Sequence, residues 1–159
     1  KKPVKPEPTI TEVKLNVPYE KAKGKDWCLP ASASMVFSYY GNNVSQSIIA
    51  SRVIVNGDAS TFRLISFARE LGFISERARL SIIEIEEYLR QCIPLIAIQK
   101  YSLSITNSHS RVIIGFDSEK SELTLHDPSG KSNYKMGYDE FFQLGFDDSK
   151  MSKIVVIRR

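Results

Sequence analysis

The chain has few cysteines, no long apolar run and little excess charge, and each of these shortages excludes a class of protein. Two cysteines among 159 residues are too few for a disulfide framework. No apolar segment approaches the roughly 20 residues that a transmembrane helix needs, so no membrane span is expected. The net charge is only +4, and no nucleic-acid-binding motif accompanies it. The excess therefore indicates a basic surface rather than a nucleic-acid partner.

Closely spaced pairs of cysteine or histidine are also lacking. Cys28, Cys92, His109 and His126 could formally provide four zinc ligands, but structural zinc sites draw their ligands from pairs a few residues apart. The two cysteines fall in different predicted elements, which argues against a bond between them. The sequence therefore predicts neither a metal site nor a disulfide.

The length fits one well-buried domain. A proline-rich run from Pro3 to Pro8 predicts an extended tether over residues 1–12, followed by a single domain over residues 13–159. Because the chain opens on Lys1 rather than Met, we expect a trimmed form. Together with the tether, this start favours an exported or cell-envelope-associated domain. No pattern indicates an oligomeric state.

Hydrophobic periodicity predicts helices in the first half of the domain and strands in the second. The first helix begins at or beside Cys28 and ends at Gly41, and further helices are predicted at residues 46–53, 60–71, 81–90 and 138–145. Strands are predicted at residues 13–17, 73–74, 93–98, 112–116, 122–125 and 154–157. This order predicts an α+β fold in which a helical half packs against an antiparallel sheet.

The cysteine at the start of the first helix is the strongest candidate for chemistry. Asp26 is predicted to cap this helix, and Pro30 is tolerated in its first turn. The small residues 31–34 allow another layer to approach the helix closely. At a helix start, unpaired N–H groups and the helix dipole favour a thiolate at Cys28. The alternative is that Cys28 is a small buried apolar residue.

A histidine and an aspartate downstream change the balance between these two interpretations. His109 is predicted at the end of a polar loop, just before the strand at residues 112–116, and Asp127 ends the following strand. An aspartate on a neighbouring strand can accept the ring N–H and fix the tautomer of the histidine. Cys28, His109 and Asp127 therefore form a candidate set of nucleophile, base and orienting carboxylate.

These residues lie in segments that resemble the bacteriocin-processing peptidase-like domains of the papain-like superfamily, which include the double-glycine leader peptidases. The segments are Val17-Pro18-Tyr19, Asp26-Trp27-Cys28-Leu29-Pro30-Ala31-Ser32, Tyr88-Leu89-Arg90-Gln91-Cys92-Ile93-Pro94, His109-Ser110-Arg111-Val112-Ile113-Ile114-Gly115 and Leu125-His126-Asp127-Pro128. The resemblance implies a papain-like fold, with Cys28 as nucleophile, His109 as general base and acid, and Asp127 as orienting residue. It implies a peptide or protein substrate and no cofactor. It makes His126 a non-catalytic strand residue and Cys92 a packing residue.

Two positions depart from the family pattern. Ala22 stands where the family usually has a glutamine whose amide helps to hold the oxyanion, and Leu29 stands where glycine is common. Loss of one oxyanion donor can cost roughly a hundredfold to a thousandfold in rate. The predicted function is thiol-dependent peptide-bond hydrolysis. The alternatives are a catalytically weak or inactive peptide-binding domain on the same fold, which Ala22 favours, and a non-proteolytic thiol acyltransferase or amidase.

Overall fold

The computed structural model of the chain describes residue 3 and residues 9–159. Most of the tether predicted for residues 1–12 lies outside the described residues, and its boundary with the domain stays a prediction. The first strand, β1 (Glu12–Lys14), begins at the end of that segment. Within the described part of the chain, no helix combines the length and the apolar character needed to cross a bilayer.

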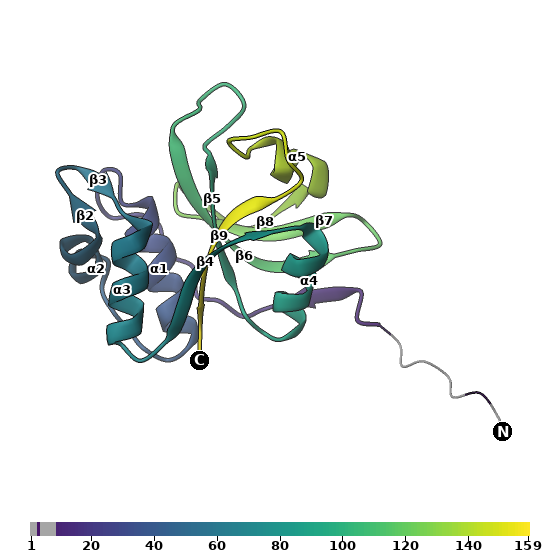
Figure 1. Cartoon of the computed structure of the whole chain (residues 1–159), viewed down its shortest axis with the longest axis horizontal. Coiled ribbons are helices and arrows are strands. Elements are labelled where there is room, and N and C mark those ends of the chain that lie inside the picture. Colours follow the sequence, from purple (N-terminus) through teal and green to yellow (C-terminus); the bar gives the residue numbers. More distant parts are fainter. Residues whose placement is uncertain (1–2, 4–8) are drawn as a thin grey trace.

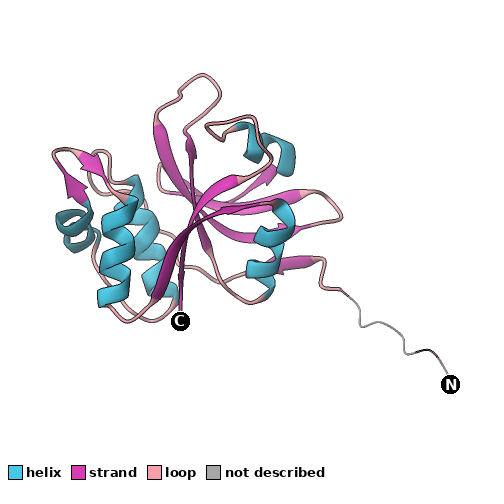
Figure 2. Ribbon diagram, viewed as in Figure 1, coloured by secondary structure: helices cyan, strands magenta, loops and turns pink. Residues whose placement is uncertain are grey.

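A seven-stranded antiparallel sheet forms the centre of the domain (Figures 1 and 2). Its strand order is β4-β9-β5-β6-β7-β8, and β1 pairs with the far part of β6. The strands are β4 (Ile74–Leu80), β5 (Leu95–Lys100), β6 (Ser108–Asp117), β7 (Glu122–Asp127), β8 (Lys131–Gly137) and β9 (Ser152–Arg158). The predicted α+β class is therefore confirmed, with β1 and β4 contributed by the N-terminal half.

Five helices of the described part of the chain surround the sheet, and Figure 1 shows α1, α2 and α3 on one side and α4 and α5 on the other. Their bounds are α1 (Cys28–Tyr39), α2 (Gln46–Val53), α3 (Thr61–Glu70), α4 (Ile82–Arg90) and α5 (Tyr138–Gln143). Serine side chains cap the starts of α2, α3 and α4, and Ser81 and Glu84 form the predicted capping box at α4. Local sequence therefore determines where these three helices begin.

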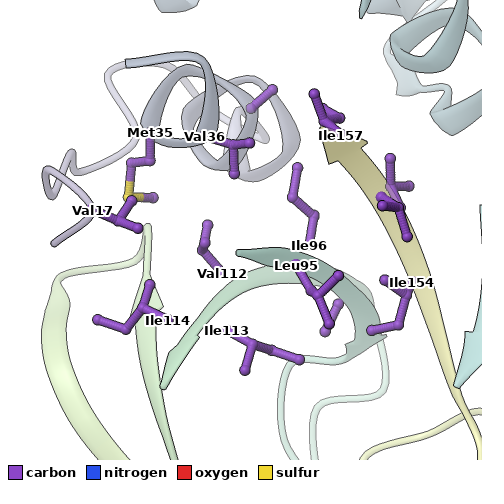
Figure 3. Close-up of a cluster of buried hydrophobic side chains, with 14 of the residues drawn as sticks. Val17, Met35, Val36, Leu95, Ile96, Val112, Ile113, Ile114, Ile154 and Ile157 are labelled. Atoms are coloured by element: carbon purple, nitrogen blue, oxygen red, sulfur yellow. The ribbon is translucent and has the colours of Figure 1, made fainter. Parts of the chain in front are cut away.

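Helix α1 packs directly on the sheet because its inward face carries both small and large apolar side chains. Figure 3 shows Met35 and Val36 of α1 directed toward Val112 of β6 and Ile96 of β5, and all four are almost completely buried. The small residues 31–34 of α1 are all buried as well. The predicted close approach is confirmed by a hydrogen bond of 3.0 Å between the hydroxyls of Ser32 and Ser110, which joins α1 to β6.

Several elements differ from their predicted bounds. The sequence reasoning missed β8 and the small hairpin of β2 (Ile54–Val55) and β3 (Asp58–Ala59). Strand β8 is mostly polar and exposed, with Met136 as its one buried residue, so it has little of the apolar signal on which strand prediction depends. Strand β6 begins four residues earlier than predicted, at Ser108 instead of 112, because polar residues at its start are buried within the sheet. Strand β5 is displaced two residues along the chain from its predicted position.

The packing role expected for Cys92 was wrong. Cys92 is exposed and has a φ of 63°, in the left-handed region. It follows the end of α4, where its N–H donates to the carbonyl of Leu89 and the next N–H donates to the carbonyl of Tyr88. Such paired bonds end many helices and require a residue in the left-handed conformation. Helix termination therefore accounts for this position.

Candidate active site

Cys28 is the first residue of α1, as predicted, but the helix start is built differently from the expectation. The predicted cap by Asp26 was wrong: Trp27 is the N-cap residue and no side chain caps the helix. Asp26 itself has a φ of 61° and is exposed, so it shapes the turn into the helix instead of capping it. As the first helical residue, Cys28 has a backbone N–H without an intrahelical acceptor. This N–H lies beside its own thiol.

His109 lies inside strand β6, not in the loop before it, and its side chain is buried. This correction matters because the pairing of the strand fixes the direction in which the His109 side chain points, whereas a loop would not fix it. Nε2 of His109 lies 2.7 Å from Oδ1 of Asp127, the last residue of the adjacent strand β7. A carboxylate only accepts, so Nε2 donates and Nδ1 remains for Cys28. The structure thus brings the three predicted residues together.

Proton affinities in this group follow from burial and from the partners of each side chain. Burial raises the pKa of the Cys28 thiol, but hydrogen bonds and charge from His109, together with hydrogen bonds from Ser110, outweigh it and leave the pKa below its ordinary value. Burial lowers the pKa of His109, but Asp127 and Cys28 outweigh it and raise the pKa overall. These opposite shifts favour transfer of the thiol proton from Cys28 to the imidazole of His109.

The carboxylate of Asp127 is held on both of its oxygens. Oδ1 accepts from His109 and also from the backbone N–H and the hydroxyl of Ser129, at 2.9 and 2.7 Å. Oδ2 accepts from Nε of Arg111 at 3.0 Å. Burial raises the pKa of Asp127, but its hydrogen bonds and the charge of His109 outweigh this effect and hold the pKa far below its usual value. Asp127 is therefore ionised and fixed in orientation.

Arg111 is the principal residue that the sequence reasoning missed. Its side chain is 5% exposed, and besides Asp127 it donates to Oη of Tyr134, Oε1 of Gln99 and the backbone carbonyls of Lys100 and Tyr101. The ring of Tyr101 also meets the ring of His109 edge to face, with centroids 5.0 Å apart. The position of Arg111 directly before the apolar residues 112–114 was the available signal, since a charged residue that is buried with such a strand requires a partner.

The remaining members of the formal zinc set lie apart from this group. Nε2 of His126 donates to the carbonyl of Val17 at 2.8 Å, and its Nδ1 accepts from the N–H of Asn133 at 3.1 Å. His126 is thus a hydrogen-bonded strand residue, in agreement with the resemblance, and both ring nitrogens are occupied. Both cysteines are free. Within residues 9–159, no three His, Cys, Asp or Glu side chains are grouped as metal ligands.

The expected oxyanion donor is missing from the structure as well as from the sequence. Ala22 lines the cleft, but its N–H is already bonded to the carbonyl of Pro128 at 2.8 Å, and its side chain is a methyl group. Gln46 lies nearby in α2 and does not replace the missing amide. Its side chain binds Glu20, the carbonyl of Lys21 and the N–H of Lys23, and it is buried. Gln46 therefore supports the loop that carries Ala22.

A cleft of about 1070 Å³ gives access to Cys28 and His109. Its walls come from the loop before α1, the β2–β3 hairpin, the loop between β5 and β6, and the turn after β7. The cleft therefore runs between the helical half and the sheet. The arrangement can bind a flexible peptide and present one of its carbonyl groups to the thiol.

Comparison with solved structures shows the same fold in several bacterial proteins. A protein described as a C39-like peptidase from Bacillus anthracis superposes with a TM-score of 0.73 at 18% identity, covering 93% of this chain and 98% of that one. The peptidase domain of the bifunctional ABC transporter ComA of Streptococcus gives 0.68 at 17% identity, covering 89% and 99%. A double-glycine-motif protease of an AMS/PCAT transporter, solved with its leader peptide, gives 0.70 at 20% identity, covering 94% and 99%. At these identities the likeness establishes the papain-like fold.

Sequence comparison gives the family. No curated protein matches the chain. The profile of the family described as papain-like cysteine protease AvrRpt2 matches residues 11–145, a range that includes Cys28, His109 and Asp127. With most of the chain matched and the papain-like fold established, the chain belongs to the family of papain-like cysteine proteases represented by AvrRpt2.

Proposed function

We propose that the chain hydrolyses peptide bonds with Cys28 as nucleophile, His109 as general base and acid, and Asp127 as the residue that orients the imidazole. The observation that supports this most directly is the position of His109. Its ring is hydrogen-bonded to Asp127 and lies close enough to Cys28 to lower the pKa of the thiol, at the wall of a cleft that reaches the solvent.

The proposed reaction has two halves. The Cys28 thiolate attacks the substrate carbonyl and forms a C–S bond. The resulting oxyanion accepts a hydrogen bond from the backbone N–H of Cys28. The His109 imidazolium then gives its proton to the leaving amine as the C–N bond breaks. A water molecule attacks the thioester while neutral His109 takes the proton of that water, and the acid product leaves as the thiolate is restored. Asp127 keeps the productive tautomer throughout.

Alkylation by iodoacetamide at neutral pH tests whether Cys28 is activated, and the chain carries its own reference thiol. Cys92 is exposed and belongs to the end of α4, away from the cleft. We expect faster modification at Cys28 than at Cys92 although Cys28 is less accessible, and we expect the advantage to vanish in His109→Ala. Equal rates at the two cysteines in the wild-type chain would remove the basis of the proposal.

A catalytically weak peptide-binding domain is the second candidate, and Ala22 favours it. With the N–H of Ala22 occupied, the N–H of Cys28 is the identified oxyanion donor. Substitution Ala22→Gln places an amide in the cleft, and we expect it to raise cleavage of a peptide library without changing the alkylation rate of Cys28. If wild type cleaves the library and Ala22→Gln adds nothing, the missing amide does not limit catalysis and the second candidate is rejected.

A further inference from the structure

A second groove, of about 390 Å³, lies next to the cleft that contains Cys28 and is lined by three basic side chains. These are Arg77 and Arg79 of the edge strand β4 and Lys153 of β9. Thr61 and Ile98 line both the groove and the cleft. An extended ligand can therefore run from one into the other without leaving the protein surface.

The register of the sheet shows which side chains connect the groove to the cleft. Arg79 lies opposite Lys153, Lys153 opposite Ile98, and Ile98 opposite Ser110. Residues directly opposite in antiparallel strands project from the same face of the sheet. One row of side chains therefore leads across four strands from Arg79 to Ser110, the residue whose hydrogen bonds help to lower the pKa of Cys28.

The spacing of this row gives the number of substrate residues between the scissile bond and the basic side chains of the groove. Neighbouring strands lie about 4.8 Å apart, so Lys153 is about 10 Å from Ser110 across the sheet and Arg79 is about 14 Å from it. An extended peptide advances about 3.3 Å per residue. The cations therefore meet side chains roughly three to five residues from the bond presented to Cys28.

The cations of the groove are incompletely neutralised. Arg79 pairs with Asp147 at 2.9 Å, and Nζ of Lys153 lies over the ring of Phe146, 5.4 Å from its centroid. Among residues 9–159, no acidic side chain forms an ion pair with Arg77 or Lys153. Asp147 interacts with both Arg79 and Lys153, and one carboxylate balances one of the three cations. Like charges directly opposite in a sheet repel, so the remaining positive charge favours an anionic ligand.

Acidic side chains occupy the other part of this surface. Asp26 and Asp58 line the cleft that also contains Cys28, so a carboxylate on the ligand is disfavoured there and favoured in the basic groove. This polarity argues for a ligand with charge at one place along its length, which a peptide has. A nucleic acid is charged at every unit and would meet both aspartates.

We infer that the groove formed by Arg77, Arg79 and Lys153 binds acidic side chains of a peptide substrate, three to five residues from the scissile bond. This specificity rests on the proposed peptidase function for its position along the substrate, whereas the binding of acidic peptide is measured without catalysis. The groove is then the part of the site that selects among peptides that fit the cleft.

Fluorescence anisotropy with two matched peptides tests the inference in the full chain carrying Cys28→Ala. One labelled decapeptide has a Glu-Glu pair and the other has Gln-Gln in its place. We expect the Glu peptide to bind more tightly than the Gln peptide. The double variant Arg77→Gln/Lys153→Gln should reduce this preference about tenfold, because it removes two exposed charge contacts. The double variant Lys14→Gln/Lys120→Gln removes the same charge from the other end of the sheet and should keep the preference.

Each outcome decides the question. Equal loss in both double variants, or no preference for the Glu peptide, overturns the inference, as does tighter binding of a single-stranded oligonucleotide than of the Glu peptide. If the groove variant is destabilised in urea, the single variant Arg77→Gln replaces it. Slow alkylation of Cys28 in an otherwise wild-type chain would overturn the peptidase proposal and leave the measured binding intact. Normal alkylation without a Glu preference would overturn the groove alone.

Discussion

Replacing Arg111 with methionine tests how the candidate site is held together. Methionine keeps most of the length and apolar character of the side chain but removes its charge and all of its donors. Arg111 donates to five acceptors, of which the Asp127 carboxylate is the only charged one. Both side chains of the ion pair are almost inaccessible, at 5% and 4% exposure. The substitution therefore leaves the buried carboxylate with His109 and Ser129 but without the guanidinium of Arg111.

The structure sets the expected magnitude. Removing one partner of a buried ion pair typically costs about 3–5 kcal/mol. Oδ1 of Asp127 keeps its three donors, from His109 and Ser129, whereas Oδ2 loses the only donor that the structure gives it. Because half of the carboxylate remains hydrogen-bonded, we expect the lower end of that range, about 3 kcal/mol.

Urea unfolding of four chains measures this cost and identifies its source. The chains are wild type, Arg111→Met, Asp127→Asn and the double variant. If the unpaired charge is responsible, the double variant is less destabilised than the sum of the two single variants, with a coupling of about 1–3 kcal/mol. Unchanged m values confirm that stability alone is compared. A strictly additive cycle, or a loss below about 1 kcal/mol in Arg111→Met, would refute the assigned role of Arg111.

Three further predictions concern the thiol, one strand contact and one helix cap. The alkylation rate of Cys28 should reach half its maximum at a lower pH than that of an ordinary thiol, and this midpoint should move upward in His109→Ala because burial alone raises the pKa of Cys28. An identical midpoint in both chains would contradict the ion pair. Gly115→Ala should destabilise the domain by about 1–3 kcal/mol, because the added Cβ would lie 2.3 Å from the carbonyl oxygen of Val13 and force β1 away; a urea midpoint equal to wild type would contradict this. Ser81→Ala should cost about 0.5–2 kcal/mol in thermal unfolding through loss of the helix cap, and an unchanged melting temperature would contradict the cap.

Elements with strong local signals could be predicted from the sequence. Helix α2 has the predicted bounds, and the capping box at Ser81 marks the start of α4 as expected. The order of Cys28, His109 and Asp127 along the chain was enough to propose that they meet. The helix bounds depend on side chains within one turn of the helix. The candidate site was recognisable because cysteine, histidine and aspartate in this order form a set with a known chemical use.

Features determined by the assembled sheet could not be predicted in the same way. Ser110 and Arg111 make the start of β6 polar, so apolar periodicity placed the strand start beyond them, although both are buried in the fold. Both are buried together with hydrogen-bond partners, among them Ser32 of α1 for Ser110 and the Asp127 carboxylate for Arg111. Such partners lie far away in the sequence and become visible only when the strands are paired.

The two halves of the candidate site consequently depend on different kinds of structure. Residues two apart on a strand share a face, so the placement of His109 and Arg111 on β6 directs both side chains to the one carboxylate that ends β7. The acid–base half is thus fixed by strand register. The half around Cys28 depends on the loop at residues 20–27, which is held through Gln46 and the carbonyl of Pro128. Under the proposed mechanism, we therefore expect a substitution in that loop, as at Ala22, to change the stabilisation of the oxyanion without disturbing Cys28 and His109. Thiol reactivity and peptide cleavage consequently have to be measured separately.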